Sequence, residues 1–255
     1  MIALAAALHL ALGMGIFSLL EAVAAVDPSR RWWRRAFVAD ALLWLTHPLS
    51  SALGMAAAAV VAGLLPRTEL ASRVATLPGW AHALLALVAV DFGAYALHYA
   101  YHRVPFLWAF HAVHHTSREI DWLSTSRLHP VSQAANAAIV AAPLLVCGLP
   151  TASVVAANAL VGLWAVLVHA NVRLDLGRLG AFVVSPAFHR HHHGRSVGAK
   201  NLGAILSVYD RLFGTWAEPL EVAPGTADDA GEHLLGLLVS PFARRSPVEP
   251  GPRRT

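Results

Sequence analysis

The chain has 255 residues, of which 56% are hydrophobic and only 13% are charged. Soluble domains usually carry about 25% charged residues, so this composition excludes an ordinary soluble globular protein and favours one embedded in a membrane. The formal charge of +4 does not indicate nucleic acid as a partner, because the arginines lie beside apolar stretches instead of along one polar face.

Three stretches in the first 101 residues are long and apolar enough to predict membrane-spanning helices. They are residues 1–26, 36–65 and 80–101, and roughly 20 apolar residues of helix cross a hydrocarbon core about 30 Å thick. The first is expected to be an uncleaved span, because its positive cluster follows the apolar run: Arg30, Arg31, Arg34 and Arg35. Pro48 interrupts the second and is expected to kink or split it.

A fourth apolar region, residues 134–168, is broken at Gly148-Leu149-Pro150 and predicts a helical hairpin with two short arms. With the first arginine cluster inside, the loop 66–79 lies outside, and the segments 101–133 and 171–255 share the cytoplasmic face. The predicted fold is an all-α integral membrane bundle with three spans, a hairpin and a cytoplasmic, histidine-rich helical cap. An inner membrane is the expected location.

The C-terminal segment from Pro224 is rich in proline, glycine and charge, and it contains one short apolar run, HLLGLLVSPF. That run is expected either to pack on the domain or to touch the membrane, and the chain beyond Ser246 is expected to be disordered. The chain thus divides into residues 1–79 with the first spans and the outer loop, residues 80–223 with the candidate site, and a tail of residues 224–255.

Histidine is concentrated in two short stretches. Of the 15 histidines, five lie between residues 98 and 115 and four between residues 189 and 193. His98 and His102 are four residues apart at the end of an apolar helix, so both rings lie on one face. Two further sets have the spacing i, i+3 and i+4, which also gathers three rings on a helical face: His111, His114 and His115, and His189, His192 and His193.

These clusters predict two metal ions. Imidazole suits iron, zinc, copper and nickel, and eight rings exceed what one metal ion can bind. His169, where the hairpin returns to the same face, is a ninth candidate. His191 points off the ligand face, and the isolated histidines are expected to be surface or hydrogen-bonded groups: His9, His47, His82 and His233.

The ordered strings HYAYH, HAVHH and HRHHH make the chain resemble the fatty acid hydroxylase and sterol desaturase superfamily. DFGAYALHYAYHRVPFLWAFHAVHHTSREIDWLSTSRLHP is similar to that family's central block, and NLGAILSVYDRLFGTW to its segment after the last box. The resemblance covers roughly residues 85–217. Tyr209 before Asp210, and Ser132 after the His-Pro box, depart from the family's usual residues and leave the subfamily open.

The resemblance implies a ligand set of nine histidines: His98, His102, His111, His114, His115, His169, His189, His192 and His193. His129, in RLHP, matches a recurring family histidine and is a candidate tenth ligand. Asp91 lies two turns before His98 and is a candidate hydrogen-bond acceptor for a ligand ring, or else makes a plain polar contact inside the helix. Asn171, in the HANV segment with His169, is a second candidate for such a supporting role.

The implied chemistry is activation of dioxygen by two iron ions, followed by hydroxylation or desaturation of a membrane lipid. The substrate is left open among a fatty acyl chain, a sterol or hopanoid, and a carotenoid. Electrons are expected from a separate protein, because the chain has no dinucleotide or haem motif and a single cysteine, Cys147. Four arginines near the boxes either reflect positive-inside topology or dock an acidic partner or lipid phosphates: Arg103, Arg118, Arg127 and Arg195.

Two alternatives to an iron oxidase stay open on the residues alone. Histidines also bind zinc, which isolated protein could carry in place of iron, so a zinc-dependent membrane hydrolase is one alternative. The chain lacks the HExxH motif of many zinc hydrolases, and a single zinc site would leave several histidines unused. The other is a non-enzymatic carrier of metal or haem, for which dense histidine clusters are hard to explain.

Overall fold

The computed structural model describes residues 2–30, 33–195, 197–226 and 231–243. Within these ranges the chain is helical, and β-structure is limited to isolated bridges. The long helices are α1 (Ile2–Ala24), α2 (Phe37–Leu64), α4 (Gly79–Tyr101), α6 (Pro130–Val146) and α7 (Thr151–His169). The shorter elements are α3 (Glu69–Ala75), α5 (Pro105–His115), η1 (Trp122–Ser126), η2 (Gly177–Ala181), α8 (Pro186–His192), α9 (Val208–Leu212) and α10 (Leu234–Ala243).

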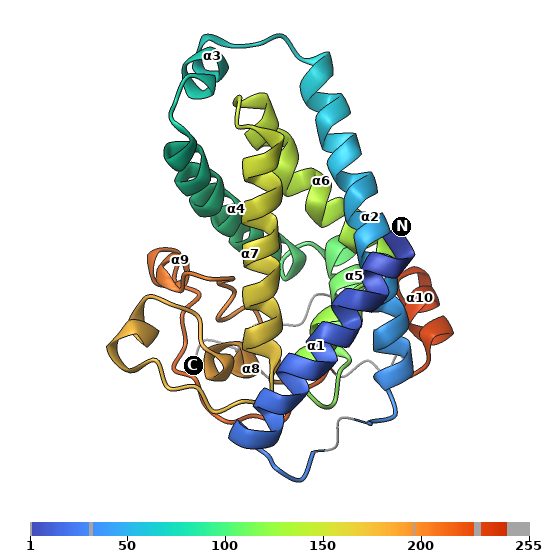
Figure 1. Cartoon of the computed structure of the whole chain (residues 1–255). Coiled ribbons are helices and arrows are strands. Elements are labelled where there is room, and N and C mark those ends of the chain that lie inside the picture. Colours follow the sequence, from blue (N-terminus) through green and yellow to red (C-terminus); the bar gives the residue numbers. More distant parts are fainter. Residues whose placement is uncertain (1, 31–32, 196, 227–230, 244–255) are drawn as a thin grey trace.

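The long helices α2, α4, α6 and α7 run along one another, and the histidine-bearing elements lie at one end of them (Figure 1). The opposite end carries α3 and the turn between α6 and α7. Gly148 in that turn has φ of 87°, and a side chain there would meet the backbone of Ala71 in α3. The predicted outer loop and hairpin turn therefore lie together, far from the candidate site.

Three helices are long and apolar enough to cross a membrane: α2, α4 and α7. The first two match predicted spans, and α7 is the second arm of the predicted hairpin, which at 19 residues is longer than expected. The first arm, α6, has 17 residues. The expected break at Pro48 does not split α2, which continues through it over 28 residues. The part of α1 with described side chains from Leu10 is shorter than a span.

Small residues bring α2 and α6 into close contact. A side-chain carbon added at Gly54 would overlap the carbonyl oxygen of Ala134 and lie 2.9 Å from the Cβ of Ala137. Beside this contact, Ala58, Ala141 and Ala157 are at most 2% exposed in a core shared by four helices. Lipid gives no hydrophobic drive for helices to associate, so close packing of small side chains is the stabilising interaction expected here.

A buried ion network joins the start of α2 to the cap. The Nη2 atom of Arg34 lies 2.7 Å from Oδ2 of Asp40, and Nε of Arg127 lies 2.9 Å from Oδ1 of the same carboxylate. Arg34 also donates to both carboxylate oxygens of Asp121. Arg34 and Arg127, both considered above as topology signals, are 8% and 1% exposed and are therefore not free surface charges.

The apolar run in the tail forms α10, which packs against α2 and α5 instead of extending away from the domain. Leu237 is fully buried there and shares a core with Leu43 and Val113. The segment beyond Ser246, for which disorder is expected, lies outside the described residues, as does Arg31 of the first arginine cluster.

Candidate metal centre

The nine predicted ligands converge into two adjacent groups. Group A consists of His98, His102, His111, His115 and His192, and group B of His114, His169, His189 and His193. In each group one ring nitrogen per residue lies within 4.8 Å of all the others. The groups touch, since the rings of His115 and His193 have centroids 4.6 Å apart. Four separate parts of the chain thus build one centre at the end of the spanning helices: the end of α4, α5, the end of α7, and α8 with the residue after it.

The two HxxHH boxes exchange one histidine each. His111 and His115 stay in group A while His114 joins group B, and His189 and His193 stay in group B while His192 joins group A. A helix turns about 100° per residue, so positions four apart differ by about 40° and the residue three along lies about 60° to the other side. Each box therefore contributes histidines to both groups.

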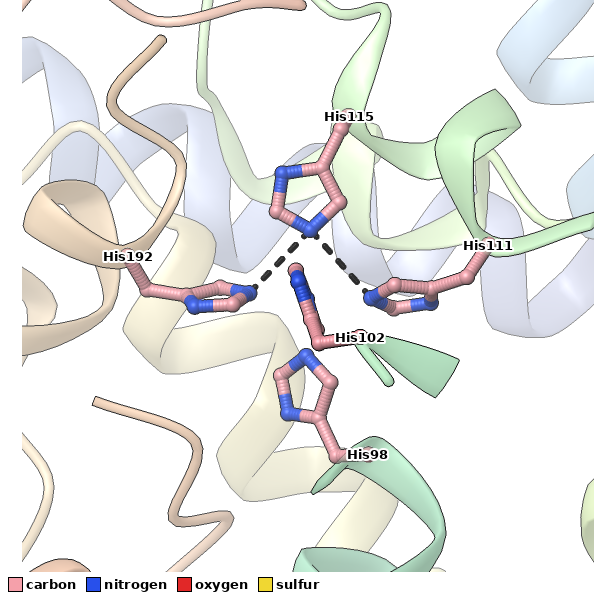
Figure 2. Close-up of side chains that lie close together, drawn as sticks. All are labelled: His98, His102, His111, His115 and His192. Carbon is pink, nitrogen blue, oxygen red and sulfur yellow. Dashed lines mark hydrogen bonds between the residues drawn. The ribbon is translucent and has the colours of Figure 1, made fainter. Parts of the chain in front are cut away.

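The ring nitrogens that meet inside the centre are the Nε2 atoms, and Figure 2 shows the five rings of group A directed at a common point. Nε2 of His115 lies 3.2 Å from that of His111 and 3.1 Å from that of His192. In group B, Nε2 of His169 lies 3.0 Å from those of both His114 and His189. The Nε2 atoms of His98 and His102 are buried without a hydrogen-bond partner.

Backbone carbonyls determine which nitrogen of three rings carries the proton. Nδ1 of His98 donates to the Leu202 carbonyl at 2.9 Å, and Nδ1 of His192 donates to the Lys200 carbonyl at 2.8 Å. In group B, Nδ1 of His169 donates to the Ala165 carbonyl at 2.7 Å. A carbonyl can only accept, so the proton sits on Nδ1 and the Nε2 lone pair faces the centre, as a metal ligand requires.

This donor set fits transition-metal ions. The Nε2 atoms of neighbouring rings lie 3.0 to 3.2 Å apart, within the range expected for ligands around one metal ion with metal–nitrogen distances of about 2.1 Å. Five converging rings in group A exceed the four ligands of a usual zinc site. The residues therefore fit a pair of transition-metal ions for which imidazole is a suitable ligand, iron among them.

Burial keeps the rings neutral. Outside the spanning helices, burial first, and charge repulsion between neighbouring groups second, lower the pKa of seven histidines well below 6.5: His102, His111, His114, His115, His189, His192 and His193. Neutral imidazole has a lone pair available for a metal ion, whereas imidazolium has none. The rings are therefore ready to bind metal at neutral pH.

The other predicted site residues lie outside both groups. His129 caps α6, accepting from the amide of Val131 at Nδ1 and contacting the Leu238 carbonyl at Nε2, each at 3.2 Å. The Asp91 carboxylate accepts from the amides of Ile205 and Leu206, so it touches the loop beside the centre and no ring. Asn171 bonds the backbone of Asp27. Of the isolated histidines with described side chains, none joins a group.

Several residues around the centre were not anticipated from the sequence. The ring of Tyr101 stacks on His111 with centroids 4.9 Å apart, and Trp108, 2% exposed, packs against His102 at 5.0 Å. The roles of the Lys200 and Leu202 carbonyls could not be predicted either, because every residue has a backbone carbonyl and residue type does not reveal its partner. Only the similarity of the NLG segment to the family block pointed to this stretch.

The fold and the site together define an all-helical membrane protein with a buried, histidine-lined centre. A model of the family described as fatty acid hydroxylase matches residues 83–215, just over half of the chain, and this range contains all nine histidines. The chain belongs to the fatty acid hydroxylase family.

Three relatives illustrate the range of the family. The ornithine lipid hydroxylase OlsE of Rhizobium tropici is 30% identical over 65% of this chain and 52% of its own length. The alkylglycerol monooxygenase of Danio rerio is 37% identical over 52% of this chain and 30% of its own length. The fatty acid hydroxylase vlmA of a Lecanicillium species is 28% identical over 62% of this chain and 49% of its own length. The chain thus spans about half or less of these relatives, and no solved structure matches it.

Proposed function

We propose that the protein is a membrane-bound di-iron oxidase that hydroxylates a membrane lipid with dioxygen and electrons from a separate protein. The observation that carries the proposal is the convergence of nine histidines, through Nε2, into two touching groups at the end of apolar helices. Relatives named as hydroxylases and monooxygenases support oxygen insertion over desaturation.

Groups A and B would each hold one iron ion, and iron supplies the activation of dioxygen that no side-chain acid or base provides. In hydroxylation one oxygen atom enters a C–H bond, and two electrons with two protons reduce the other atom to water. The chain's described residues contain no cofactor-binding motif for these electrons, so a separate donor supplies them. By the positive-inside pattern, this occurs at the cytoplasmic face of an inner membrane.

The chain's own residues orient the rings and keep water out. Carbonyls hold three rings by Nδ1, and the side chains of Tyr101 and Trp108 cover group A with buried aromatic surface. Excluding water from this site would favour reaction with the substrate over side reactions with water. The centre would therefore suit a substrate that reaches it from an apolar phase.

An apolar groove of about 430 Å³ supports a lipid chain as that substrate. It is lined by residues of α1, α4 and α7, among them Ile16, Leu20, Leu163 and Leu167, and by Ile205. Ile205 belongs to the loop whose Leu202 carbonyl holds His98. A chain of methylene groups fits this groove, because the lining offers no polar partner and the chain needs none. An acyl or alkyl lipid is accordingly the proposed substrate class, in line with the lipids named for two relatives.

The test is oxygen-dependent conversion of lipid extracts by purified protein in detergent, supplied with ferrous iron and a chemical or protein reductant. Mass spectrometry is expected to detect a lipid product heavier by one oxygen atom, labelled when ¹⁸O₂ is used. His192→Ala is expected to abolish turnover and lower bound iron, whereas the neighbouring His191→Ala retains both. Tightly bound zinc with esterase activity and no oxygen uptake would instead favour a hydrolase.

A further inference from the structure

Asn201 has a backbone conformation that L-residues rarely adopt. Its φ is 58°, and among the described residues it alone combines a positive φ with a side chain. The residue is fully buried, directly between the two residues whose carbonyls hold ligands of group A. Left-handed backbone at a residue other than glycine persists only where surrounding contacts impose it, and it tends to occur at functional positions.

The dihedral angles of Asn201, together with those of Leu202, set the direction of one carbonyl relative to the other. The Lys200 carbonyl lies on the N-terminal side of the φ and ψ bonds of Asn201 and accepts from His192 of α8. The Leu202 carbonyl lies on their C-terminal side and accepts from His98 of α4. Both rings belong to group A, although they come from helices far apart in the chain. The backbone of one residue therefore influences the orientation of two rings in the same candidate metal group.

Hydrogen bonds to the segment 210–217 hold residues 201–203 in place. The amide of Asn201 donates to the Thr215 carbonyl at 2.9 Å, and its Oδ1 accepts from the amide of Ala217 at 2.7 Å. The carboxylate of Asp210 accepts from the amides of Leu202 and Gly203 at 2.7 and 2.8 Å. Nδ2 of Asn201 also lies 3.5 Å from the Phe188 carbonyl in α8. By contrast, Nδ1 of His169 in group B donates to the carbonyl of Ala165 inside its own helix and not to this loop.

We infer that Asn201 is a positioning residue for group A, whose left-handed backbone aims the carbonyls of Lys200 and Leu202 at His192 and His98. The inference rests on the proposed function insofar as both groups bind metal. Outer partners of metal-ligating histidines typically contribute about 10–100-fold to metal affinity. The backbone of Asn201 should therefore determine how tightly group A binds its metal ion, and should leave group B unaffected.

A matched pair of variants separates backbone conformation from side-chain contacts. Asn201→Gly and Asn201→Ala lose the same side-chain hydrogen bonds, but only glycine adopts the left-handed region without strain. The probe is ferrous iron alone, added to purified protein in detergent and followed by elemental analysis and by the rate of iron loss to a chelator. The glycine variant is expected to keep two iron atoms per chain. The alanine variant is expected to keep about one, or to release one at least about tenfold faster.

Gly177→Ala is the strain control, because Gly177 has φ of 50° with open space around it and bonds no histidine. It should keep two iron atoms. Combining Asn201→Ala with ligand variants identifies the group that is affected. His193→Ala disables group B, so adding Asn201→Ala should also remove the iron of group A. His115→Ala disables group A, so adding Asn201→Ala should leave the iron of group B in place.

The inference is overturned if Asn201→Ala and wild type have equal iron content and equal rates of iron loss. It is also overturned if Asn201→Gly loses iron as fast as Asn201→Ala, because the effect would then come from the side chain and not from the backbone conformation. If Asn201→Ala does not yield folded protein, Asp210→Asn tests the same loop, and wild-type iron retention there overturns it. A wild-type chain that binds no iron contradicts the proposed function instead, so the two failures are distinct.

Discussion

Asp40 and Arg127 form an ion pair with almost no exposure to solvent: Nε of Arg127 lies 2.9 Å from Oδ1 of Asp40, and the two side chains are 1% and 0% exposed. Asp40 lies in the first turn of α2, and Arg127 directly follows η1. Removing one partner of such a pair leaves a buried charge without compensation, which typically costs about 3–5 kcal/mol. Asp40→Ala should therefore lower the Tm of the detergent-purified protein strongly.

Glu69→Ala provides the control for this prediction, because Glu69 and Arg73 form an i,i+4 pair in which both side chains are more than three-quarters exposed. Exposed pairs contribute little, so its Tm should hardly change. The double variant Asp40→Leu with Arg127→Met should lose less stability than the two single changes added together. Additive losses would mean that the pair is not energetically coupled.

His129 is expected to stabilise α6 without binding metal. His129→Ala removes the cap on the amide of Val131 and should cost about 1 kcal/mol, since that is the usual contribution of a helix N-cap. Asparagine caps helices well, so His129→Asn should recover part of the loss. Elemental analysis should find two iron atoms per chain in both variants, and loss of one would return His129 to the ligand set.

The contact between α2 and α6 should tolerate no side chain at Gly54. Gly54→Ala would force a carbon against the carbonyl of Ala134, and overpacking of this kind costs about 1–3 kcal/mol. Gly63 lies on the same helix with nothing within 4 Å, so Gly63→Ala should match or exceed the wild-type Tm. Similar Tm values for the two variants would contradict close packing at Gly54.

The orientation of the bundle is testable by labelling. In a Cys147→Ala background, Arg67→Cys lies in the loop at the α3 end, and Arg195→Cys is exposed at the end with the centre. With the centre in the cytoplasm, a membrane-impermeant maleimide should label Arg67→Cys in intact cells and Arg195→Cys only after permeabilisation. The reverse pattern would put the centre outside.

Much of the fold and of the candidate site could be predicted, because both depend on local periodicity. Apolar length alone indicated α2 and α4, and the helical spacing of His98 with His102 indicated that their rings would share a face. The hairpin was anticipated from Gly148-Leu149-Pro150, but the length of α7 was not. Pro48 was expected to kink or split α2, and the helix is not split, since it packs along α6 and continues through the proline.

By itself, the sequence determined that three sets of histidines each lie on one helical face, because residue spacing sets direction within one helix. Only the tertiary structure decided that His114 and His192 leave their boxes to join the opposite group, since that depends on how α5 and α8 face each other. It also decided the role of Asn201, whose neighbouring carbonyls reach His98 and His192 across the fold. Contacts between distant segments arise from packing, and no local pattern encodes them.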